Sequence, residues 1–436
     1  MGAITCKFGG SSLADAACIR QAKQIIDANP ERRFIVPSAP GKRNAADRKI
    51  TDLLYAWHSI AAQGLDASEP KSIIAERFAE LARELSVKFD IMSLLEEIGE
   101  EAGQGSADFM ASRGEYLNGR LMAEVLDATF VDPAECVFFT ASGHFDEKSY
   151  DALSERLKGE GRFVVPGFYG SLPNGRIKTF SRGGSDVTGA IVARATGSDV
   201  YENWTDVSGF RMTDPRIVPE AQRIDEVTYM ELRELSYMGA TVLHDEAIFP
   251  VRATGTPICI KNTHDPESPG TTILARRESK RPVCGIAGRG GFSMINIEKA
   301  LMNKERGFGL RVLAVLDEHG LSWEHMPTGI DTISIIVRTE DLEGKTDDIL
   351  ADLRDRCRPD SLNITEGLAM IATVGQGMVH HVGVAARLCD ALAGARVNLR
   401  VIDQGSSEMN IIVGVEEEDL ETAVKAIYFA FANWDC

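Results

Sequence analysis

Residues 4–12 read ITCKFGGSS, an apolar run that carries one lysine, Lys7, and ends in two glycines and two serines. Two interpretations of Lys7 are open: a strand lysine that faces water, or a charge in a phosphate site. Gly9 and Gly10 would let the backbone approach a ligand closely. A helix-like pattern follows, and its N-terminus, which Ser11 or Ser12 could cap, would favour an anion. The stretch is not a P-loop, and the only Gly-Lys-Thr in the chain, at 344–346, lacks that motif's first glycine.

Several other short apolar runs also end in glycine, small or polar residues. They are residues 34–42 (FIVPSAPGK), 137–143 (VFFTASG), 163–170 (FVVPGFYG), 200–209 (VYENWTDVSG) and 257–262 (PICIKN). Each is typical of a buried strand, and helical patterns such as IRQAKQII lie between them. This alternation predicts an α/β fold with a mainly parallel sheet. Ligands bind beyond the carboxyl ends of the strands in such sheets, so we expect the site there.

Residues 179–197, TFSRGGSDVTGAIVARATG, place an arginine and two glycines before a predicted helix. A loop with Asp186 as its N-cap would explain the aspartate but not Arg182. An arginine beside paired glycines at a helix N-terminus can clamp a carboxylate or phosphate with two hydrogen bonds. The stretch is therefore a candidate anion site.

Composition limits the classes of function. The chain has 436 residues, enough for two or three domains, and 44% of them are hydrophobic, as in globular proteins. A net charge of −18 argues against nucleic acid or an anionic membrane as the main partner. The eight cysteines form no C-x-x-C pair, which indicates reduced thiols in a cytoplasmic protein. Neither a signal peptide nor an apolar stretch long enough to span a bilayer is present.

Four motifs in order resemble those of the aspartate kinases, within the amino-acid kinase family. They are KFGGSS at 7–12, SRGGSD at 181–186, WTDVSGF with MTDPR at 204–216, and MGATVLHDEAI at 238–248. The resemblance implies that residues 1–280 form an open, mainly parallel sheet flanked by helices. It also implies phosphorylation of the side-chain carboxylate of L-aspartate by ATP, giving 4-phospho-L-aspartate. Mg²⁺ would arrive with ATP, without metal ligands from protein side chains.

The resemblance also assigns roles to individual residues. Lys7 and Asp186 would be catalytic. The lysine would neutralise charge on the transferring phosphoryl group, and the aspartate would position the lysine. Glu115 would hold the substrate ammonium and Arg182 the α-carboxylate, within a substrate set of Ser38, Thr51, Glu115, Phe168, Arg182 and Ser185. The nucleotide set would be Lys7, Gly9, Gly10, Ser11, Thr205, Asp206, Arg211, Arg216 and Lys261. At Arg211 many relatives have an aromatic or aliphatic residue, which leaves that contact open.

The end of the chain repeats itself. Residues 309–337 and 383–413 each contain two glycines eleven positions apart, a helical pattern between them, and an extended segment ending in Ile-Ile-Val. This predicts a tandem β-α-β-β-α-β unit. The two units resemble paired ACT modules, which sense free amino acids and build subunit interfaces. We expect modules at 281–362 and 363–436, partly interleaved, and a homodimer or dimer of dimers. No dinucleotide fingerprint follows, so we expect a monofunctional kinase.

Paired ACT modules imply feedback inhibition, with L-lysine as the first expected effector and L-threonine as the second. The first module has the better candidate pocket. Gly307 and Gly309 lie where a helix N-terminus could take the effector carboxylate. Glu324 could take a cationic amine or be an acid in solvent, and its counterpart in the second repeat, Asn398, has no charge.

Two other classes of function compete with the aspartate kinase of the lysine, threonine and methionine pathway. A kinase for another acidic amino acid is disfavoured by Thr51, Glu115 and the ACT pair. A catalytically silent amino-acid sensor is disfavoured because Lys7, Arg182 and Asp186 are all present.

Overall fold

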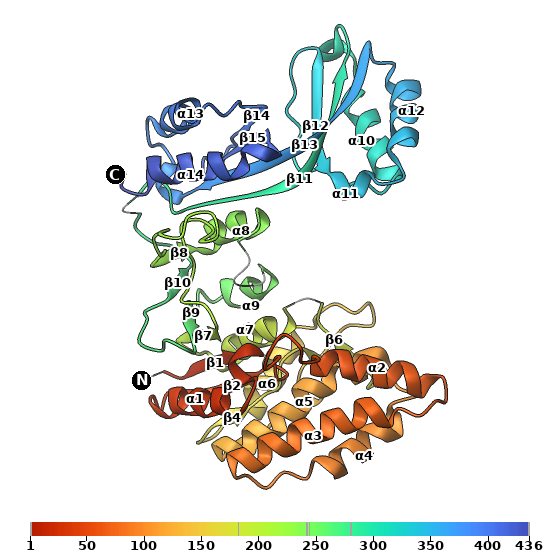
Figure 1. The fold of residues 1–436 in the computed structure, drawn as a ribbon, viewed down its shortest axis with the longest axis vertical. Coiled ribbons are helices and arrows are strands. Elements are labelled where there is room, and N and C mark those ends of the chain that lie inside the picture. Colours follow the sequence, from red (N-terminus) through yellow and green to blue (C-terminus); the bar gives the residue numbers. More distant parts are fainter. Residues whose placement is uncertain (1, 182, 241–242, 244, 280, 435–436) are drawn as a thin grey trace. The chain divides into compact units, whose positions relative to one another are not determined.

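The computed structural model describes residues 2–181, 183–240, 243, 245–279 and 281–434 (Figure 1). The chain forms two compact units. The first contains residues 1–210, 225–229 and 241–277, and the second contains residues 211–224, 230–240 and 278–436. The predicted boundaries at 280 and 362 stay a prediction.

The first unit is built on a sheet of eight strands. In sheet order they are β3 (Thr129–Phe130), β4 (Phe163–Val164), β2 (Arg32–Pro37), β1 (Ile4–Phe8), β7 (Val200–Thr205), β9 (Ile258–Asn262), β10 (Thr271–Leu274) and β8 (Glu226–Thr228). Among these described strands only β9 and β10 pair antiparallel. The predicted mainly parallel α/β sheet is confirmed.

Strand β1 lies in the middle of this sheet, and its side chains alternate between the two faces. Cys6 and Phe8 are fully buried in one core, where the Phe8 ring stacks on Trp204 at 6.1 Å between centroids. Lys7 faces the other side, against helix α7 (Gly184–Thr196), which packs on β1, β2 and β7. The alternation of a strand therefore places one lysine opposite the Cys6 and Phe8 core.

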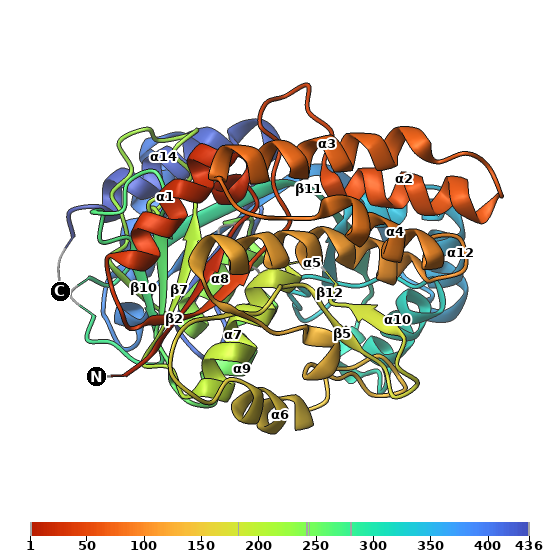
Figure 2. The same ribbon diagram turned by 90° about the horizontal axis from the view of Figure 1, so that it is seen from below.

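Long helices cover one side of the first unit (Figures 1 and 2). They are α1 (Ala16–Asp27), α2 (Ile50–Ala62), α3 (Ser68–Leu85), α4 (Ile91–Glu101) and α5 (Ala107–Leu126). Helix α1 begins at Asp15, whose carboxylate accepts the Cys18 N–H at 2.8 Å, and α5 is capped by Ser106 in the same manner. The expectation that Ser11 or Ser12 caps α1 was wrong, because both lie in the preceding short 3-10 helix η1 (Ser11–Leu13).

One predicted strand is absent from the described sheet. Residues 137–143 form only isolated bridges, from Phe138 to Ser171 and from Phe139 to Phe145. Val137 and Phe139 are buried, but the backbone of this segment pairs locally beside the hairpin of β5 (Tyr169–Ser171) and β6 (Ile177–Thr179). Helices α6 (Lys148–Arg156), α8 (Tyr229–Tyr237) and α9 (Ile248–Arg252) complete the part before residue 278.

The second unit contains an antiparallel sheet in the order β12 (Thr332–Arg338), β11 (Gly285–Glu298), β13 (Ser361–Val374), β15 (Asn410–Glu416) and β14 (Val401–Asp403). The two long strands pair along their whole length, from Gly285 opposite Val374 to Glu298 opposite Ser361. Helix α10 (Phe308–Glu318) packs on α12 (Thr346–Cys357), and α13 (Val384–Gly394) packs on α14 (Leu420–Phe431). The described segments therefore repeat a strand, helix and strand pattern twice, while β11 and β13 run through both repeats.

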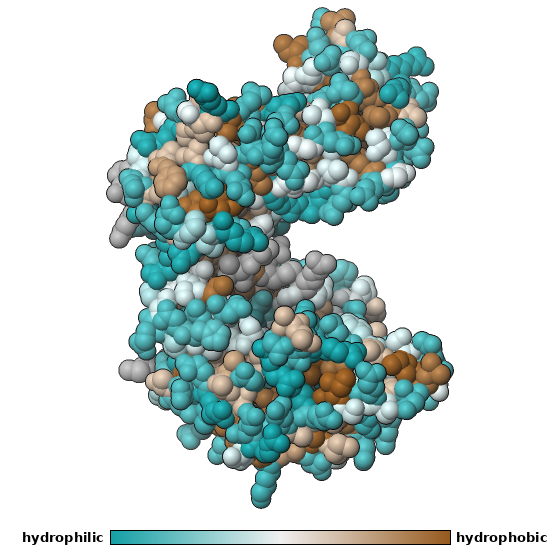
Figure 3. Space-filling view, in the orientation of Figure 1, coloured by the Kyte–Doolittle hydropathy of each residue, from teal (hydrophilic) through white to brown (hydrophobic). Residues whose placement is uncertain are grey.

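Hydrophilic side chains cover most of the face in Figure 3, and apolar ones form small groups. Within the described ranges, no helix has the length and apolar character needed to cross a membrane.

Candidate active site

Lys7 is held by two polar partners on the face of the sheet covered by α7. Its Nζ lies 2.6 Å from Asp186 Oδ1 and 3.5 Å from Asn203 Oδ1, and Asn203 Nδ2 donates to Asp186 Oδ1 at 2.8 Å. Lys7 and Asn203 are direct neighbours in the β1–β7 register. The Lys7 and Asp186 side chains are only 10% and 15% exposed. The strand lysine therefore does not face open water.

Asp186 does not cap helix α7. The N-cap is Gly183, with φ of 67°, and the Asp186 carboxylate in the first turn binds Lys7 and Asn203 instead. The Tyr201 hydroxyl also donates to the Asp186 backbone carbonyl at 3.0 Å. The Asp186 carboxylate therefore orients Lys7 and does not cap the helix. Sequence reasoning missed Asn203, since only the strand order makes it a neighbour of Lys7.

The two glycines after Lys7 allow two loops to touch. The Gly41 N–H donates to the Gly10 carbonyl at 2.8 Å. A Cβ on Gly10 would lie 2.9 Å from the Ala39 carbonyl oxygen, and a Cβ on Gly41 would lie 2.6 Å from the Gly10 carbonyl. On Gly9 a Cβ would lie 3.6 Å from Lys7 Nζ. We call residues 9–12 the glycine turn and residues 38–41 the SAPG loop; they meet at the carboxyl ends of β1 and β2.

Helix α5 places unpaired polar atoms beside the SAPG loop. Glu115 is 8% exposed, and its buried Oε2 has no hydrogen-bond partner among the described residues. Burial raises the pKa of Glu115 to about 7, although a backbone hydrogen bond at Ala39 opposes this. Asn118, three residues later and fully buried, donates to the Ser38 carbonyl at 2.6 Å, and its Oδ1 is likewise unpartnered in the described part of the chain. Such buried unpaired acceptors suit a ligand that brings donors.

The first turn of α2, which carries the half-buried Thr51, lies beside the same part of α5. A Cβ on Gly114 would lie 3.0 Å from Ala39 Cβ and 3.5 Å from Ile50 Cγ2. The predicted substrate residues Ser38, Thr51 and Glu115 therefore come from three segments that pack together.

Phe168 and Ser185 meet at the start of α7. The Phe168 N–H donates to Thr188 Oγ1 at 3.0 Å, and a Cβ on Gly184 would lie 2.6 Å from Phe168 Cδ2. Phe168 has φ of 82°, a conformation that costs a residue with a side chain about 1 to 3 kcal/mol and clusters at functional sites. A Cβ on Gly167 would lie 2.5 Å from Ser185 Oγ. The neighbouring Arg182 lies outside the described residues.

Some predicted nucleotide residues lie at the carboxyl ends of neighbouring strands. Lys261 is opposite Trp204 in the β7–β9 register, with Nζ 5.3 Å from the indole ring. The Thr205 hydroxyl donates to Asp206 Oδ1 at 3.1 Å. Arg211 and Arg216 belong to the second unit, where Arg211 donates to the Ala221 carbonyl at 2.7 Å and the exposed Arg216 pairs with Asp214 at 2.6 Å.

The predicted effector residues lie in the second unit. Gly307 is the N-cap of α10, with φ of 73°, and Gly309 is in its first turn. Glu324 is not an acid in solvent: its side chain is 7% exposed, accepts from Arg338 Nε at 3.0 Å and accepts the Tyr237 hydroxyl. Its charge is already paired.

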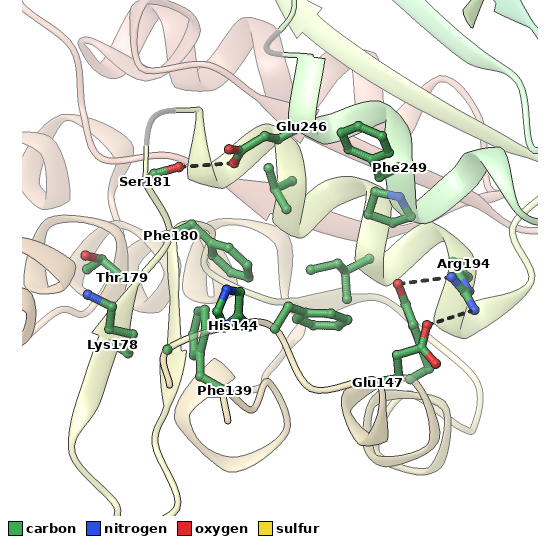
Figure 4. A pocket seen from close by; sticks show the side chains of 16 residues that line it. Phe139, His144, Glu147, Lys178, Thr179, Phe180, Ser181, Arg194, Glu246 and Phe249 are labelled. Carbon is green, nitrogen blue, oxygen red and sulfur yellow. Dashed lines mark hydrogen bonds and ion pairs between the residues drawn. The ribbon is translucent and has the colours of Figure 1, made fainter. Parts of the chain in front are cut away.

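A cavity of about 760 Å³ lies beside α7 in the first unit, lined by rings such as Phe139, Phe145 and Phe180 (Figure 4). Four of its polar side chains bind one another in pairs: Ser181 donates to Glu246 at 3.1 Å, and Arg194 donates to the Tyr150 hydroxyl at 3.2 Å. None of the predicted site residues that the structure describes lines it. The cavity is therefore distinct from the Lys7 site.

Comparisons of the sequence and of the structure with known proteins find similar proteins of one kind. A model of the amino acid kinase family matches residues 3–262, and a model of the ACT domain matches residues 371–431. The chain is 38% identical to Aspartokinase 3 of Bacillus subtilis over 98% of both chains. It is similar to the crystal structure of Clostridium acetobutylicum aspartate kinase, with a TM-score of 0.92, 48% identity, and 99% and 100% of the two chains covered.

Two structures of Escherichia coli aspartokinase III are also similar, each at 28% identity with 98% of this chain and 99% of the other covered. One is a complex with aspartate and ADP, with a TM-score of 0.75, and the other a complex with lysine and aspartate, with a TM-score of 0.74.

Proposed function

The chain belongs to the aspartokinases of the amino acid kinase family, and from that premise we propose that Lys7 and Asp186 carry its phosphoryl transfer. The enzyme uses ATP to phosphorylate the side-chain carboxylate of L-aspartate, giving 4-phospho-L-aspartate and ADP. The observation that carries the site assignment is the 2.6 Å pair of Lys7 and Asp186 beside the glycine turn. We place this reaction at the first step towards lysine, threonine and methionine.

Phosphoryl transfer requires alignment and positive charge more than covalent chemistry from the protein. The acceptor carboxylate and the γ-phosphate are both anionic, so their approach is repulsive. Lys7 supplies the compensating charge, and Asp186 and Asn203 fix the direction of its ammonium group. Because these contacts hold the ammonium group in place, little reorganisation is needed at the moment of reaction.

L-aspartate needs a partner for its ammonium and one for its α-carboxylate. Glu115 suits the ammonium, because its Oε2 is buried and unpartnered among the described residues. Asn118 Oδ1 offers a second acceptor on the same helix. Arg182 and Ser185 take the α-carboxylate, while Ser38, Thr51 and Phe168 line the pocket.

The nucleotide lies along the carboxyl ends of β1, β7 and β9, in contact with Gly9, Gly10, Ser11, Thr205, Asp206 and Lys261. Arg211 and Arg216 are assigned to the nucleotide by the family pattern alone. Mg²⁺ comes with ATP and is held mainly by phosphate oxygens. Mg²⁺ is a hard cation that prefers oxygen ligands such as these. The ion supplies further neutralisation of the phosphate charge.

The regulatory part consists of residues 281–362 and 363–436, and the enzyme forms a homodimer or dimer of dimers in the cytoplasm. L-lysine is the proposed inhibitor, with L-threonine as the alternative; the lysine and aspartate complex of the E. coli relative supports lysine. Its carboxylate would bind at Gly307 and Gly309. Its side-chain amine would join or replace the partners of Glu324.

A coupled ADP-release assay over a panel of amino acids tests the function. ADP release that depends on L-aspartate is expected. Release with glutamate or N-acetylglutamate instead would indicate another kinase of the family. The absence of ADP release with every amino acid of the panel would indicate a catalytically silent sensor.

A further inference from the structure

Helix α3 carries a buried arginine with no assigned role. Arg77 is 4% exposed, and its Nη2 donates to the Ala14 carbonyl at 2.6 Å and the Gly41 carbonyl at 2.9 Å. Its Nη1 donates to the Asp47 carboxylate. One guanidinium therefore contacts Ala14, the residue that follows the 3-10 helix η1 and lies two residues after the glycine turn, the last residue of the SAPG loop, and a carboxylate further along the chain.

The two loops that Arg77 joins follow different strands and carry different parts of the proposed site. The glycine turn follows β1 and borders the phosphates, while the SAPG loop follows β2 and contains Ser38 on the aspartate side. Apart from Arg77, they meet through the hydrogen bond from the Gly41 N–H to the Gly10 carbonyl at 2.8 Å. Both carbonyls accept from Nη2, while Nη1 donates to Asp47. The planar guanidinium therefore fixes the two carbonyls relative to the carboxylate through two nitrogens, which an ammonium with its single nitrogen cannot reproduce.

Asp47, the carboxylate partner of Arg77, stays ionised and is held in place by a second arginine. Hydrogen bonds from Arg43, and then from Arg77, hold the pKa of Asp47 well below its usual range. Arg43 Nε lies 3.1 Å from Asp47, and Arg43 Nη1 lies 2.9 Å from Glu80 on α3. The segment from Gly41 to Asp47 is therefore tied to α3 at both of its ends.

We propose that Arg77 is a positioning residue that sets the separation of the glycine turn and the SAPG loop, and so aligns the γ-phosphate with the aspartate carboxylate. The inference rests on the proposed function. Each substrate keeps its own contacts when Arg77 changes, but their mutual alignment is lost. A misplacement of about 1 Å can cost roughly a hundredfold in rate, so the loss should fall on kcat rather than on binding.

The test compares the wild type with Arg77→Lys and with Arg83→Lys, a matched control at an exposed arginine of the same helix. Calorimetric titrations with L-aspartate and with a non-hydrolysable ATP analogue give the fraction of intact sites and each Kd. We expect Arg77→Lys to bind both with a stoichiometry near one and Kd values within about threefold, while kcat per intact site falls roughly 10- to 100-fold. Arg83→Lys should match the wild type.

Two further variants test the inference if Arg77→Lys folds poorly. In Arg77→Ala, millimolar guanidinium should restore turnover in a saturable manner, whereas methylammonium at equal concentration should not. Asp47→Asn, which keeps the arginine but weakens its hold, should show a smaller loss of kcat.

A kcat per intact site within twofold of the wild type in Arg77→Lys, or the absence of guanidinium rescue in Arg77→Ala, would overturn the inference. Loss of affinity for one substrate at unchanged kcat would also overturn it. An inactive wild type would instead contradict the proposed function itself.

Discussion

Lys7 Nζ lies 2.6 Å from Asp186 Oδ1, although one residue comes from the first strand of the chain and the other from the first turn of α7. Asn203 bridges the pair from β7, the strand next to β1. An ammonium group with three donors can keep both partners and still direct a proton at a phosphoryl oxygen.

We predict that Lys7→Ala lowers kcat at least a hundredfold, because loss of one preorganised charge at a transferring group costs about 3 to 4 kcal/mol. Steady-state kinetics with circular dichroism as the check on folding measures this. Lys23→Ala, at a half-exposed lysine of α1, is the control. A variant at position 7 with nearly normal kcat would remove Lys7 from the mechanism.

Asn203→Ala should lower kcat by a smaller factor, roughly tenfold, since Asp186 still holds Lys7 after one hydrogen bond is lost. The KM for L-aspartate should change little, as Asn203 contacts Lys7 and Asp186 rather than the Glu115 region. If the KM for L-aspartate rose while kcat stayed constant, Asn203 would belong to the substrate pocket and not to the lysine.

The KM for L-aspartate should depend on pH through Glu115. Burial raises the pKa of this carboxyl to about 7, so below that pH it is protonated in the free enzyme and cannot pair with an ammonium. From pH 8 to pH 6 its ionised fraction falls from about 90% to about 10%, so the KM should rise roughly ninefold. The KM for ATP should stay constant.

Glu115→Gln is the control for this pH effect and should flatten the profile at a uniformly high KM. The same pKa has a consequence for stability: the folded state keeps the proton up to about pH 7, while the unfolded state releases it near 4.5. This group therefore reduces stability as pH rises between those values, and urea titrations should show that slope disappear in the variant. A wild-type KM that is constant from pH 6 to 8 would contradict the role of Glu115.

Arg182→Ala should raise the KM for L-aspartate and leave ATP affinity nearly unchanged. Removing a charged partner of a buried substrate group typically costs about 2 to 5 kcal/mol. An increase confined to the KM for ATP would show that the substrate and nucleotide residues are misassigned.

Glu324→Ala should leave uninhibited activity intact and raise the lysine concentration needed for half inhibition. An allosteric coupling of about 1 to 3 kcal/mol corresponds to a 5- to 150-fold range. Glu340→Ala is a matched control, because Glu340 also contacts Arg338, at 3.5 Å, but is exposed. A wild type insensitive to lysine in a titration run beside threonine would refute the effector, whereas an unchanged Glu324→Ala curve would refute only the pocket.

The parallel sheet could be predicted, because short apolar runs ending in glycine or polar residues mark strands and their carboxyl ends. The pairing of Lys7 with Asp186 could be expected only from the resemblance to the aspartate kinases. Asn203 could not be predicted from the residues, since chain order does not reveal that β7 lies next to β1. The positive φ of Phe168 could not be predicted either, since phenylalanine has no preference for it; this residue packs against Gly184 and donates to Thr188. Arg77 is an ordinary helical arginine until the fold brings two carbonyls to it.

The most direct test of the central claim is a trapping assay with ATP, L-aspartate and hydroxylamine. Hydroxylamine attacks the acyl phosphate, releases inorganic phosphate and leaves the side-chain hydroxamate of aspartate, which mass spectrometry quantifies beside ADP. The wild type should form ADP and hydroxamate in equal amounts, and Lys7→Ala should form both at less than about one hundredth of that rate. ADP without hydroxamate, or equal rates in the two proteins, would contradict phosphorylation of aspartate at the Lys7 site.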